Sequence, residues 1–454
     1  MTNRPSKQAS HTACRLYLTE MDTRNQEIPP PKLINALKRF DLLPAIVFLP
    51  TRRKCDEAAQ DVGADRSQEF NTERQMLRRD MFEKFEADFP EISDHKHRKL
   101  IVYSGVAAHH AGHIPAWKLL VEKMMSSGLL NAIFATSTVA AGVDFPARTV
   151  VISNADARGN DGWRSLSASE LQQMTGRAGR RGRDNVGFVV LVPSPFQNAK
   201  KIAELLSAKP DPLESRFKAT YTSLLNLLDA YGNFKQVREI AEKSFAFRES
   251  RRAIADDRHD NGAEMLSNRI WEPFENRARV LDHFEYIDFE AEKVLDNGKW
   301  LADLRIDRPL LVGEALKTGI FDQLSISEAA ALMASVASDA DRSDGEMRTT
   351  RKTNELLDDL GTVVISVANV EWKNGVDPVE ELNYSAAAAA ERWAAGMEWD
   401  DLVGRTKAEP GDLVRLLART GEALRQLGNL RDSNPTAAAI AHGAAETILR
   451  EPVR

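Results

Sequence analysis

The sequence has little cysteine and no long apolar run. Cys14 and Cys55 are too few for a disulfide framework and form no metal-binding pattern. No apolar stretch approaches the roughly 18 residues of a membrane-spanning helix, and the N-terminal residues lack the apolar core of a signal peptide. A net charge of -6 argues against a surface that is basic throughout, although a local basic groove is compatible with it. These absences predict a cytoplasmic protein in a reduced compartment, with no membrane partner.

Short apolar runs divide the chain into two parts. Five runs that are rich in strand-forming residues alternate with helical segments, which predicts an α/β domain with a parallel sheet; they are residues 45–49, 99–105, 131–136, 149–153 and 186–192. After about residue 195 such runs stop. The remaining chain is predicted to be mainly helical, for example over residues 224–231, 384–397 and 422–427.

Composition also suggests two irregular segments. Residues 1–31 are polar and end in three consecutive prolines, which predicts an extended tail or linker. Residues 255–264 are charged and contain Asn-Gly, which predicts a linker between helical blocks.

The stretch QQMTGRAGRRGR, residues 172–183, concentrates positive charge in an otherwise acidic chain. Arg177 and Arg180 are three residues apart and can converge on one target, and a guanidinium presents forked donors that match phosphate oxygens. Gly176 and Gly179 allow the backbone to approach a ligand closely. The cluster therefore suggests a phosphate ligand, and the alternative is a solvated basic loop.

Two further segments follow predicted strands. In ATSTVAAGVDFPA, residues 135–147, Thr138 offers a hydroxyl, and Gly142 and Asp144 offer a turn with a carboxylate at the end of a strand where ligands of parallel sheets bind. The alternative is an ordinary strand-to-helix connection with a capping residue.

In YSGVAAHHAGHIP, residues 103–115, three histidines raise the question of a metal site: His109, His110 and His113. Gly112 and Pro115 interrupt any helix that would align these histidines, and no acidic or cysteine ligand lies close by in the sequence. We therefore expect no metal.

These segments together resemble the C-terminal half of superfamily 2 DExH-box helicases of the superkiller type, the exosome-associated RNA helicases and their bacterial relatives. QMTGRAGRRG resembles their arginine-finger motif, ATSTVAAGVDFPA the motif before it, and GVAAHHAGHIP a segment peculiar to the family; AIVFLPTRRKCDEAA resembles the first strand of the second RecA-like domain. The resemblance continues to the end of the chain. It implies a second RecA-like domain over 32–200, a winged-helix-like region over 201–262 and a helical ratchet domain over 263–454.

The resemblance also implies roles for individual residues. Arg177 and Arg180 would be arginine fingers that face the γ-phosphate of ATP. The residues expected near the nucleotide are Gln173, Gly142, Asp144 and Gly176, and those on the RNA side are Pro50, Thr51, Arg52, His109, His110, Gly112 and Thr138. In the expected ratchet helix, residues 412–427, the inward face would be Leu413, Leu417, Thr420, Leu424 and Leu427. Arg415 and Arg419 would contact RNA from another face, and the alternative for them is a solvated surface.

The sequence departs from the family in the parts that hold ATP. It contains no G-x-x-x-x-G-K-[ST], and the only DExx-like stretch, Asp56–Ala59, is predicted on a helix and not at the end of a strand. ATP and Mg²⁺ are therefore expected only when a first RecA-like domain completes the site. That domain is on another polypeptide, or was lost by truncation, or the chain is an ATP-independent module.

Two functions follow from this reading. The chain is expected to be the C-terminal part of an ATP-dependent RNA helicase that binds single-stranded RNA, or DNA, and is inactive as an ATPase alone. The alternative is a non-enzymatic RNA- or DNA-binding module. Only about 14 residues, 254–267, stand where the eukaryotic relatives carry a long arch, so binding of adaptors through an arch is not expected.

Overall fold

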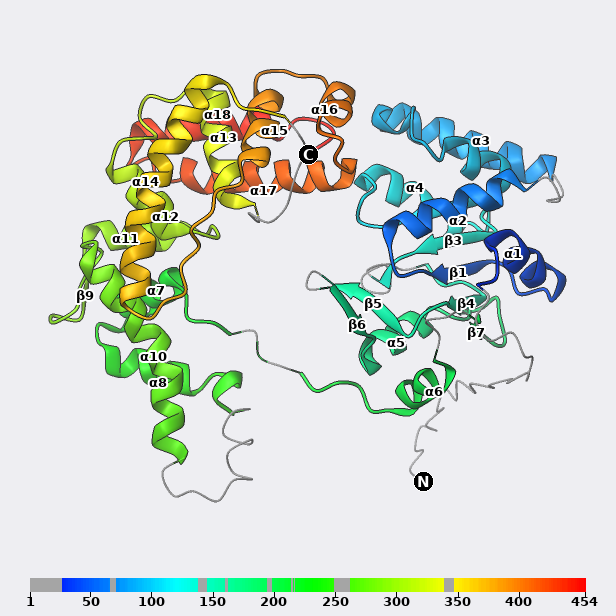
Figure 1. Ribbon diagram of the computed structural model, residues 1–454, viewed down its shortest axis with the longest axis horizontal. Coiled ribbons are helices and arrows are strands. Elements are labelled where there is room, and N and C mark those ends of the chain that lie inside the picture. The colour runs from blue at the N-terminus through cyan, green and yellow to red at the C-terminus, as the bar shows by residue number, and fades with distance from the viewer. Residues whose placement is uncertain are drawn as a thin grey trace, which may run out of the picture. The chain divides into compact units, whose positions relative to one another are not determined.

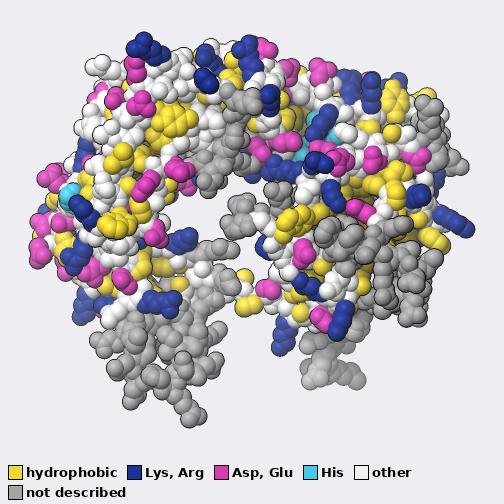
Figure 2. Space-filling model, viewed as in Figure 1, with side chains coloured by type: hydrophobic (Ala, Val, Ile, Leu, Met, Phe, Trp, Pro, Cys, Tyr) yellow, Lys and Arg dark blue, Asp and Glu magenta, His cyan; other side chains and the backbone are white. Residues whose placement is uncertain are grey.

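The computed structural model describes residues 27–65, 71–137, 145–159, 162–193, 198–213, 215, 217–248, 262–338 and 347–454. The chain forms two compact units, Met1–Pro212 and Leu213–Arg454 (Figure 1). No helix among the described residues is long and apolar enough to cross a membrane. On the face drawn in Figure 2, acidic and basic side chains are interspersed over the surface of each unit.

The first unit is built on a five-stranded parallel sheet in the order β2-β3-β1-β4-β7. Its strands are β1 (Ala45–Phe48), β2 (Val106–His109), β3 (Ala132–Ala135), β4 (Thr149–Ile152) and β7 (Phe188–Leu191). The strands β1 to β4 are buried along their whole length, as expected for a parallel sheet covered on both faces. The predicted α/β class is therefore confirmed.

The helices of this unit are α1 (Pro30–Arg39), α2 (Arg52–Ala64), α3 (Thr72–Asp88), α4 (Pro115–Ser126), α5 (Ala168–Thr175) and α6 (Ala199–Ser207), with a short 3₁₀ helix at Pro90–Ile92. The side chain of Thr51 caps α2 by accepting from the Lys54 N–H at 3.2 Å. The apolar side of α2, which includes Cys55, Ala59 and Val62, packs in the same core as β1, β2 and β3. Thr51 and Arg52 are thus fixed at the carboxyl end of β1.

Two sequence predictions in this unit were wrong. Helix α1 begins at Pro30, so the last two of the three prolines are helical and not part of a tail. Proline fits there because the first turn of a helix has no intrahelical partner for its N–H groups. The segment Leu100–Ser104 is a π-helix and not a strand. Its carbonyls at Val102 and Tyr103 accept from the buried Arg78 guanidinium of α3, at 2.8 and 3.1 Å, which replaces the partners that a sheet would supply.

The sequence analysis also missed an antiparallel hairpin, β5 (Asp156–Gly159) and β6 (Gly162–Ser165). Strand β6 is mostly exposed, so the hairpin lacks an apolar run of the kind that marks the buried strands. The hairpin leads directly into α5.

The second unit is mainly helical, as predicted. Its helices are α7 (Tyr221–Tyr231), α8 (Phe234–Glu242), α10 (Gly262–His283), α11 (Asp296–Asp303), α12 (Pro309–Lys317), α13 (Ile326–Ala337), α14 (Arg351–Lys373), α15 (Tyr384–Ala394), α16 (Trp399–Thr406), α17 (Pro410–Gly428) and α18 (Pro435–Ile448). A two-stranded hairpin, β8 (Ile287–Asp288) and β9 (Lys293–Val294), follows α10. The predicted linker lies partly outside the described residues, and its last three residues belong to α10.

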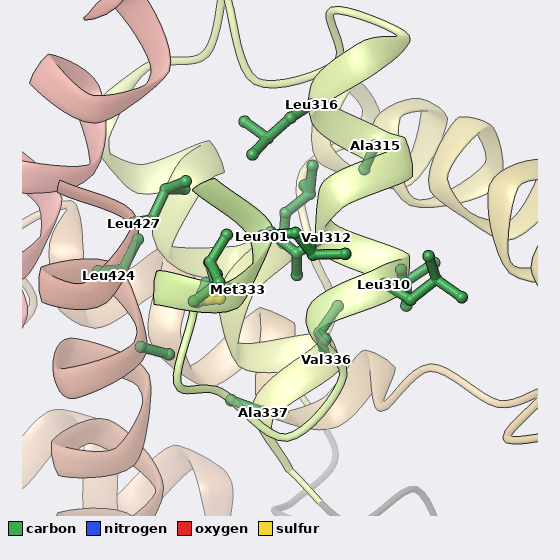
Figure 3. Packing of buried hydrophobic residues seen from close by; sticks show 14 of the residues in the cluster. Leu301, Leu310, Val312, Ala315, Leu316, Met333, Val336, Ala337, Leu424 and Leu427 are labelled. Carbon is green, nitrogen blue, oxygen red and sulfur yellow. The ribbon is translucent and has the colours of Figure 1, made fainter. Parts of the chain in front are cut away.

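Helix α17 packs its predicted inward face into the core of this unit. Leu413, Leu417, Thr420, Leu424 and Leu427 are all fully buried. Figure 3 shows Leu424 and Leu427 directed toward Met333 of the central helix α13, which is buried along nearly all of its length. The helical period of the sequence therefore identified the correct face. The boundaries of a winged-helix-like region and a ratchet domain inside this unit stay predictions.

Candidate functional site

The arginine loop, residues 176–183, follows α5 and is attached to Ala147, two residues before the start of β4. Helix α5 starts with a capping box in which Ser167 and Glu170 satisfy each other's backbone N–H groups. After the helix, the Ala147 N–H donates to the Arg177 carbonyl at 3.0 Å, and the Gly179 N–H donates to the Ala147 carbonyl at 2.7 Å. The loop therefore has a defined backbone between two fixed points.

Two glycines make this attachment sterically possible. Gly179 has φ +93°, which a side chain rarely tolerates, and a Cβ on Gly187 would lie 2.4 Å from the Ala178 carbonyl oxygen. Gly187 immediately precedes β7. The arginine loop thus lies at the amino ends of β4 and β7, and close backbone packing holds it there.

The side chain of Arg180 is held within the loop by Asp184. Its Nε lies 2.7 Å from Asp184 Oδ2 and its Nη2 lies 2.9 Å from Oδ1, and the Arg180 N–H also donates to Oδ2 at 2.9 Å. Hydrogen bonds from the Arg180 guanidinium lower the pKa of Asp184, and the same bonds raise the pKa of Arg180. The sequence analysis did not name Asp184. An acidic residue four positions after a candidate arginine finger could have indicated an ion pair.

The structure describes some of the other predicted site residues and not others. Gln173 and Gly176 are exposed, and Arg177 is partly buried. Thr138, Gly142 and Asp144 lie outside the described residues. The expected approach of these three residues to a nucleotide or to RNA stays a prediction.

The residues predicted on the RNA side lie at the opposite end of the sheet. Pro50 and Thr51 follow the carboxyl end of β1, and Arg52 begins α2. His109 is the last residue of β2, and His110 and Gly112 come next. The strands β1, β2, β4 and β7 all run parallel. This group therefore lies at the carboxyl ends of the strands, and the arginine loop lies at the amino ends.

His109 and His110 are buried and engaged with acidic side chains. The Nε2 of His109 lies 2.9 Å from Glu122 Oε1 of α4, and the Nε2 of His110 lies 3.1 Å from Asp56 Oδ1 of α2. No acidic residue lies close to these histidines in the sequence, but α2 and α4 bring both carboxylates to them from other parts of the chain. A direct RNA contact by the two rings stays a prediction.

Asp56 is the centre of a larger histidine cluster, which comprises Asp56, His95, His97, His110 and His113 with Lys96. The Nζ of Lys96 lies 2.8 Å from Asp56 Oδ2, and the Nε2 atoms of His97 and His113 each lie 3.5 Å from Oδ1. His95 stacks on Trp117 with ring centroids 3.5 Å apart, and its Nε2 lies 3.1 Å from His113 Nδ1. Asp56, His110 and His113 each place a potential ligand atom within 4.8 Å of the other two, which is compatible with a metal site by distance alone.

The backbone indicates where the protons of these rings lie. The Gly112 N–H donates to His110 Nδ1 at 3.1 Å, so a neutral His110 carries its proton on Nε2 and donates it to Asp56. The His97 N–H donates to His95 Nδ1 at 3.2 Å, so His95 carries its proton on Nε2 and donates it to His113 Nδ1. The proton of His113 then lies on Nε2, toward Asp56.

This proton arrangement disfavours a metal ion. A metal ligand needs a free lone pair on the coordinating nitrogen, whereas His110 and His113 both direct an N–H toward Asp56. We expect that titration of the chain with Zn²⁺ at pH 7 detects no stoichiometric site at this cluster. Stoichiometric Zn²⁺ binding that is lost in both His110→Ala and His113→Ala, and kept in His442→Ala, would contradict the assigned tautomers.

The pKa shifts agree with neutral rings. Burial lowers the pKa of His97 to about 4 and that of His113 to about 3, and burial also lowers the pKa of His95 far below its usual value. Burial opposes ionisation of Asp56, but the N–H groups of His110, His113 and Lys96 around the carboxylate outweigh it and keep its pKa far below the usual value. His95, His97 and His113 are therefore neutral near pH 7 and lie around one ionised carboxylate.

In the second unit, the two predicted RNA-contacting arginines of α17 are exposed and ion-paired. Arg415 pairs with Asp412 one turn earlier on the helix. Arg419 donates from Nε at 3.1 Å and from Nη2 at 2.8 Å to Asp307, which precedes α12. Exposed pairs of this kind contribute about 0–1 kcal/mol, so a phosphate can compete for both guanidinium groups.

Comparison with known proteins identifies this helical region. Residues 291–454 match the DSHCT (NUC185) domain. The chain is 34% identical over 261 residues to the DExH-box ATP-dependent RNA helicase DExH15, chloroplastic, of Arabidopsis thaliana, which covers 52% of this chain and 22% of the relative. It is 31% identical to the antiviral helicase SKI2 of Saccharomyces cerevisiae, over 53% of this chain and 19% of the relative. The matched part of the chain is thus similar to the C-terminal region of superkiller-type DExH-box RNA helicases.

A bacterial relative gives the same result. The probable helicase HelY of Mycobacterium tuberculosis is 33% identical over 246 residues, which is 50% of this chain and 26% of the relative. The chain therefore spans only about a quarter or less of the length of these relatives.

Proposed function

We propose that this chain supplies the arginine fingers and part of the nucleic-acid-binding surface of an ATP-dependent RNA helicase. The observation that carries the proposal is the separation of two sets of residues across one sheet. The arginine loop is fixed at the amino ends of β4 and β7, while Thr51, Arg52 and the segment after β2 lie at the carboxyl ends. With this separation, the residues at the amino ends of the strands can contact ATP while the residues at the carboxyl ends contact RNA.

In this proposal, Arg177 and Arg180 act on a nucleotide that another RecA-like domain holds. The 454 residues contain no G-x-x-x-x-G-K-[ST] loop, which cradles the phosphates in these motors. ATP and Mg²⁺ would therefore bind only when a first RecA-like domain completes the site. Three relatives are named as helicases, which supports the same reading. The test is ATP hydrolysis by the chain mixed with such a domain.

A second candidate function is a non-enzymatic RNA- or DNA-binding module. The same missing phosphate loop favours it, together with the exposed arginines of α17. The two candidates differ in whether a first RecA-like domain restores hydrolysis. Both predict binding of single-stranded RNA by the chain alone.

The double variant Arg415→Ala, Arg419→Ala is expected to weaken binding of single-stranded RNA and to make it less sensitive to salt. Each arginine that neutralises a phosphate contributes about 0.7 to the slope of log affinity against log salt concentration. The slope should thus fall by about 1.4 in the double variant. Fluorescence anisotropy with a labelled single strand, repeated over a salt series, measures both quantities.

A matched control is available in the same unit. Arg279 and Arg351 are also exposed and paired with an acidic residue of their own helix. The double variant Arg279→Ala, Arg351→Ala should leave affinity and salt slope unchanged. Equal losses in the two double variants, or no loss in either, would remove α17 from the proposed RNA-binding surface.

A further inference from the structure

We propose that Asp184 is a positioning residue that directs the Arg180 guanidinium toward a bound triphosphate. The inference rests on the proposed arginine-finger function and adds a residue to it. An unrestrained arginine must lose the freedom of several rotatable bonds when it contacts the phosphate. A carboxylate that already fixes the guanidinium removes that loss from the reaction step.

The geometry of the pair is specific. Asp184 contacts the Nε and Nη2 side of the guanidinium, at 2.7 and 2.9 Å, through both of its oxygens. The guanidinium has five N–H groups, and this pairing uses one on Nε and one on Nη2. The other N–H of Nη2 and the two N–H groups of Nη1 are directed away from Asp184. These groups are the forked donors that fit two phosphate oxygens.

Asp184 is itself held in place, so it can keep the Arg180 guanidinium in one orientation. Its side chain is only 1% exposed, whereas that of Arg180 is 21% exposed. The Asp184 N–H donates to the Arg180 carbonyl at 2.9 Å, and Gly182, with φ +76°, allows the chain to fold back between them. On the other side, Arg148 Nη1 lies 3.6 Å from Asp184 Oδ1, and Arg148 Nη2 lies 3.2 Å from Asp41 Oδ2.

The same contact could instead hold Arg180 back from the nucleotide. The two roles predict opposite results when the carboxylate is removed. If Asp184 positions Arg180, its loss lowers the rate of hydrolysis; if Asp184 restrains Arg180, its loss raises that rate. The buried carboxylate, together with the N–H groups of the guanidinium that face away from it, favours positioning.

The test uses RNA-stimulated ATP hydrolysis by the full chain mixed with a separately prepared first RecA-like domain of a relative. Asp184→Asn is expected to lower kcat about ten-fold or more and to change KM less than about three-fold, because the contact acts in the transition state. Asp184→Ala should have no further effect in an Arg180→Ala background, since it acts through Arg180. Asp41→Asn, an exposed carboxylate of the same network, is the control and should behave like the parent chain.

An unchanged or raised kcat in Asp184→Asn would overturn the inference, and so would additive effects of Asp184→Ala and Arg180→Ala. An inactive mixture, or a mixture whose activity Arg180→Ala leaves unchanged, would instead overturn the proposed function.

A second measurement, on the chain alone, tests the contact between Asp184 and Arg180 in either case. The NMR signal of the Arg180 Nε–H, assigned by its loss in Arg180→Lys, should be protected from exchange at pH 7 and lose that protection in Asp184→Asn. Equal protection in both proteins would refute the contact.

Discussion

Arg180→Ala is expected to abolish ATP hydrolysis in a mixture of this chain with a first RecA-like domain. Arginine fingers supply about 10³–10⁵ in rate because they stabilise charge that develops on the transferred phosphoryl group. The Arg180 guanidinium is partly exposed, and its loop is attached to Ala147 through backbone hydrogen bonds that do not involve this side chain. Steady-state hydrolysis with saturating single-stranded RNA measures the loss. Arg177→Ala is expected to have an effect of the same kind.

The control lies in the same loop. Arg181 is exposed, and Arg181→Ala should retain most of the activity of the mixture. The chain alone is expected to hydrolyse no ATP, and brisk RNA-stimulated hydrolysis by the pure chain would mean that it contains a phosphate site of its own. No activity in the mixture would favour the non-enzymatic binding module.

Acidification from about pH 7 to pH 4 is expected to unfold the first unit before the second. His95, His97 and His113 have folded-state pKa values below the ordinary value of 6.5, because burial disfavours their charged forms. The unfolded chain therefore binds more protons than the folded one below about pH 6.5. The stability that these groups contribute is present above pH 6.5 and is lost as the pH falls toward 4 and 3. Each group contributes a slope of about 1.4 kcal/mol per pH unit in this range.

Urea unfolding followed at several pH values measures this slope. His97→Leu removes a buried titrating ring whose two nitrogens have no hydrogen-bond partner among the described residues, so the variant should be more stable than the parent below pH 6. Its stability should fall less steeply with acid, by about one proton. His442→Leu replaces an exposed histidine of the second unit and should leave the pH dependence unchanged. A parent chain whose stability is flat between pH 6.5 and 4 would show that the cluster is not buried and neutral.

Local pattern was enough to find much of the helicase region. The apolar runs at residues 45–49, 131–136, 149–153 and 186–192 each contain a strand of the sheet, since a strand covered on both faces must be apolar throughout. The spacing of leucines placed the buried face of α17 correctly. The order of helix, arginine loop and strand around Arg177 and Arg180 also follows from composition, because glycine and arginine are excluded from the cores on either side.

Other features depended on contacts between distant segments. Asp56 and His110 are 54 positions apart, and only the packing of α2 beside β2 brings them to 3.1 Å. The apolar run at residues 99–105 forms a π-helix because Arg78 of α3 satisfies its carbonyls. The sequence by itself determined four strands of the sheet, the helical character of the second unit and the buried face of α17, because these depend on the local pattern of apolar residues. Only the tertiary structure decided which side chains meet, because a hydrogen bond or a buried charge depends on neighbours that the order of residues does not specify.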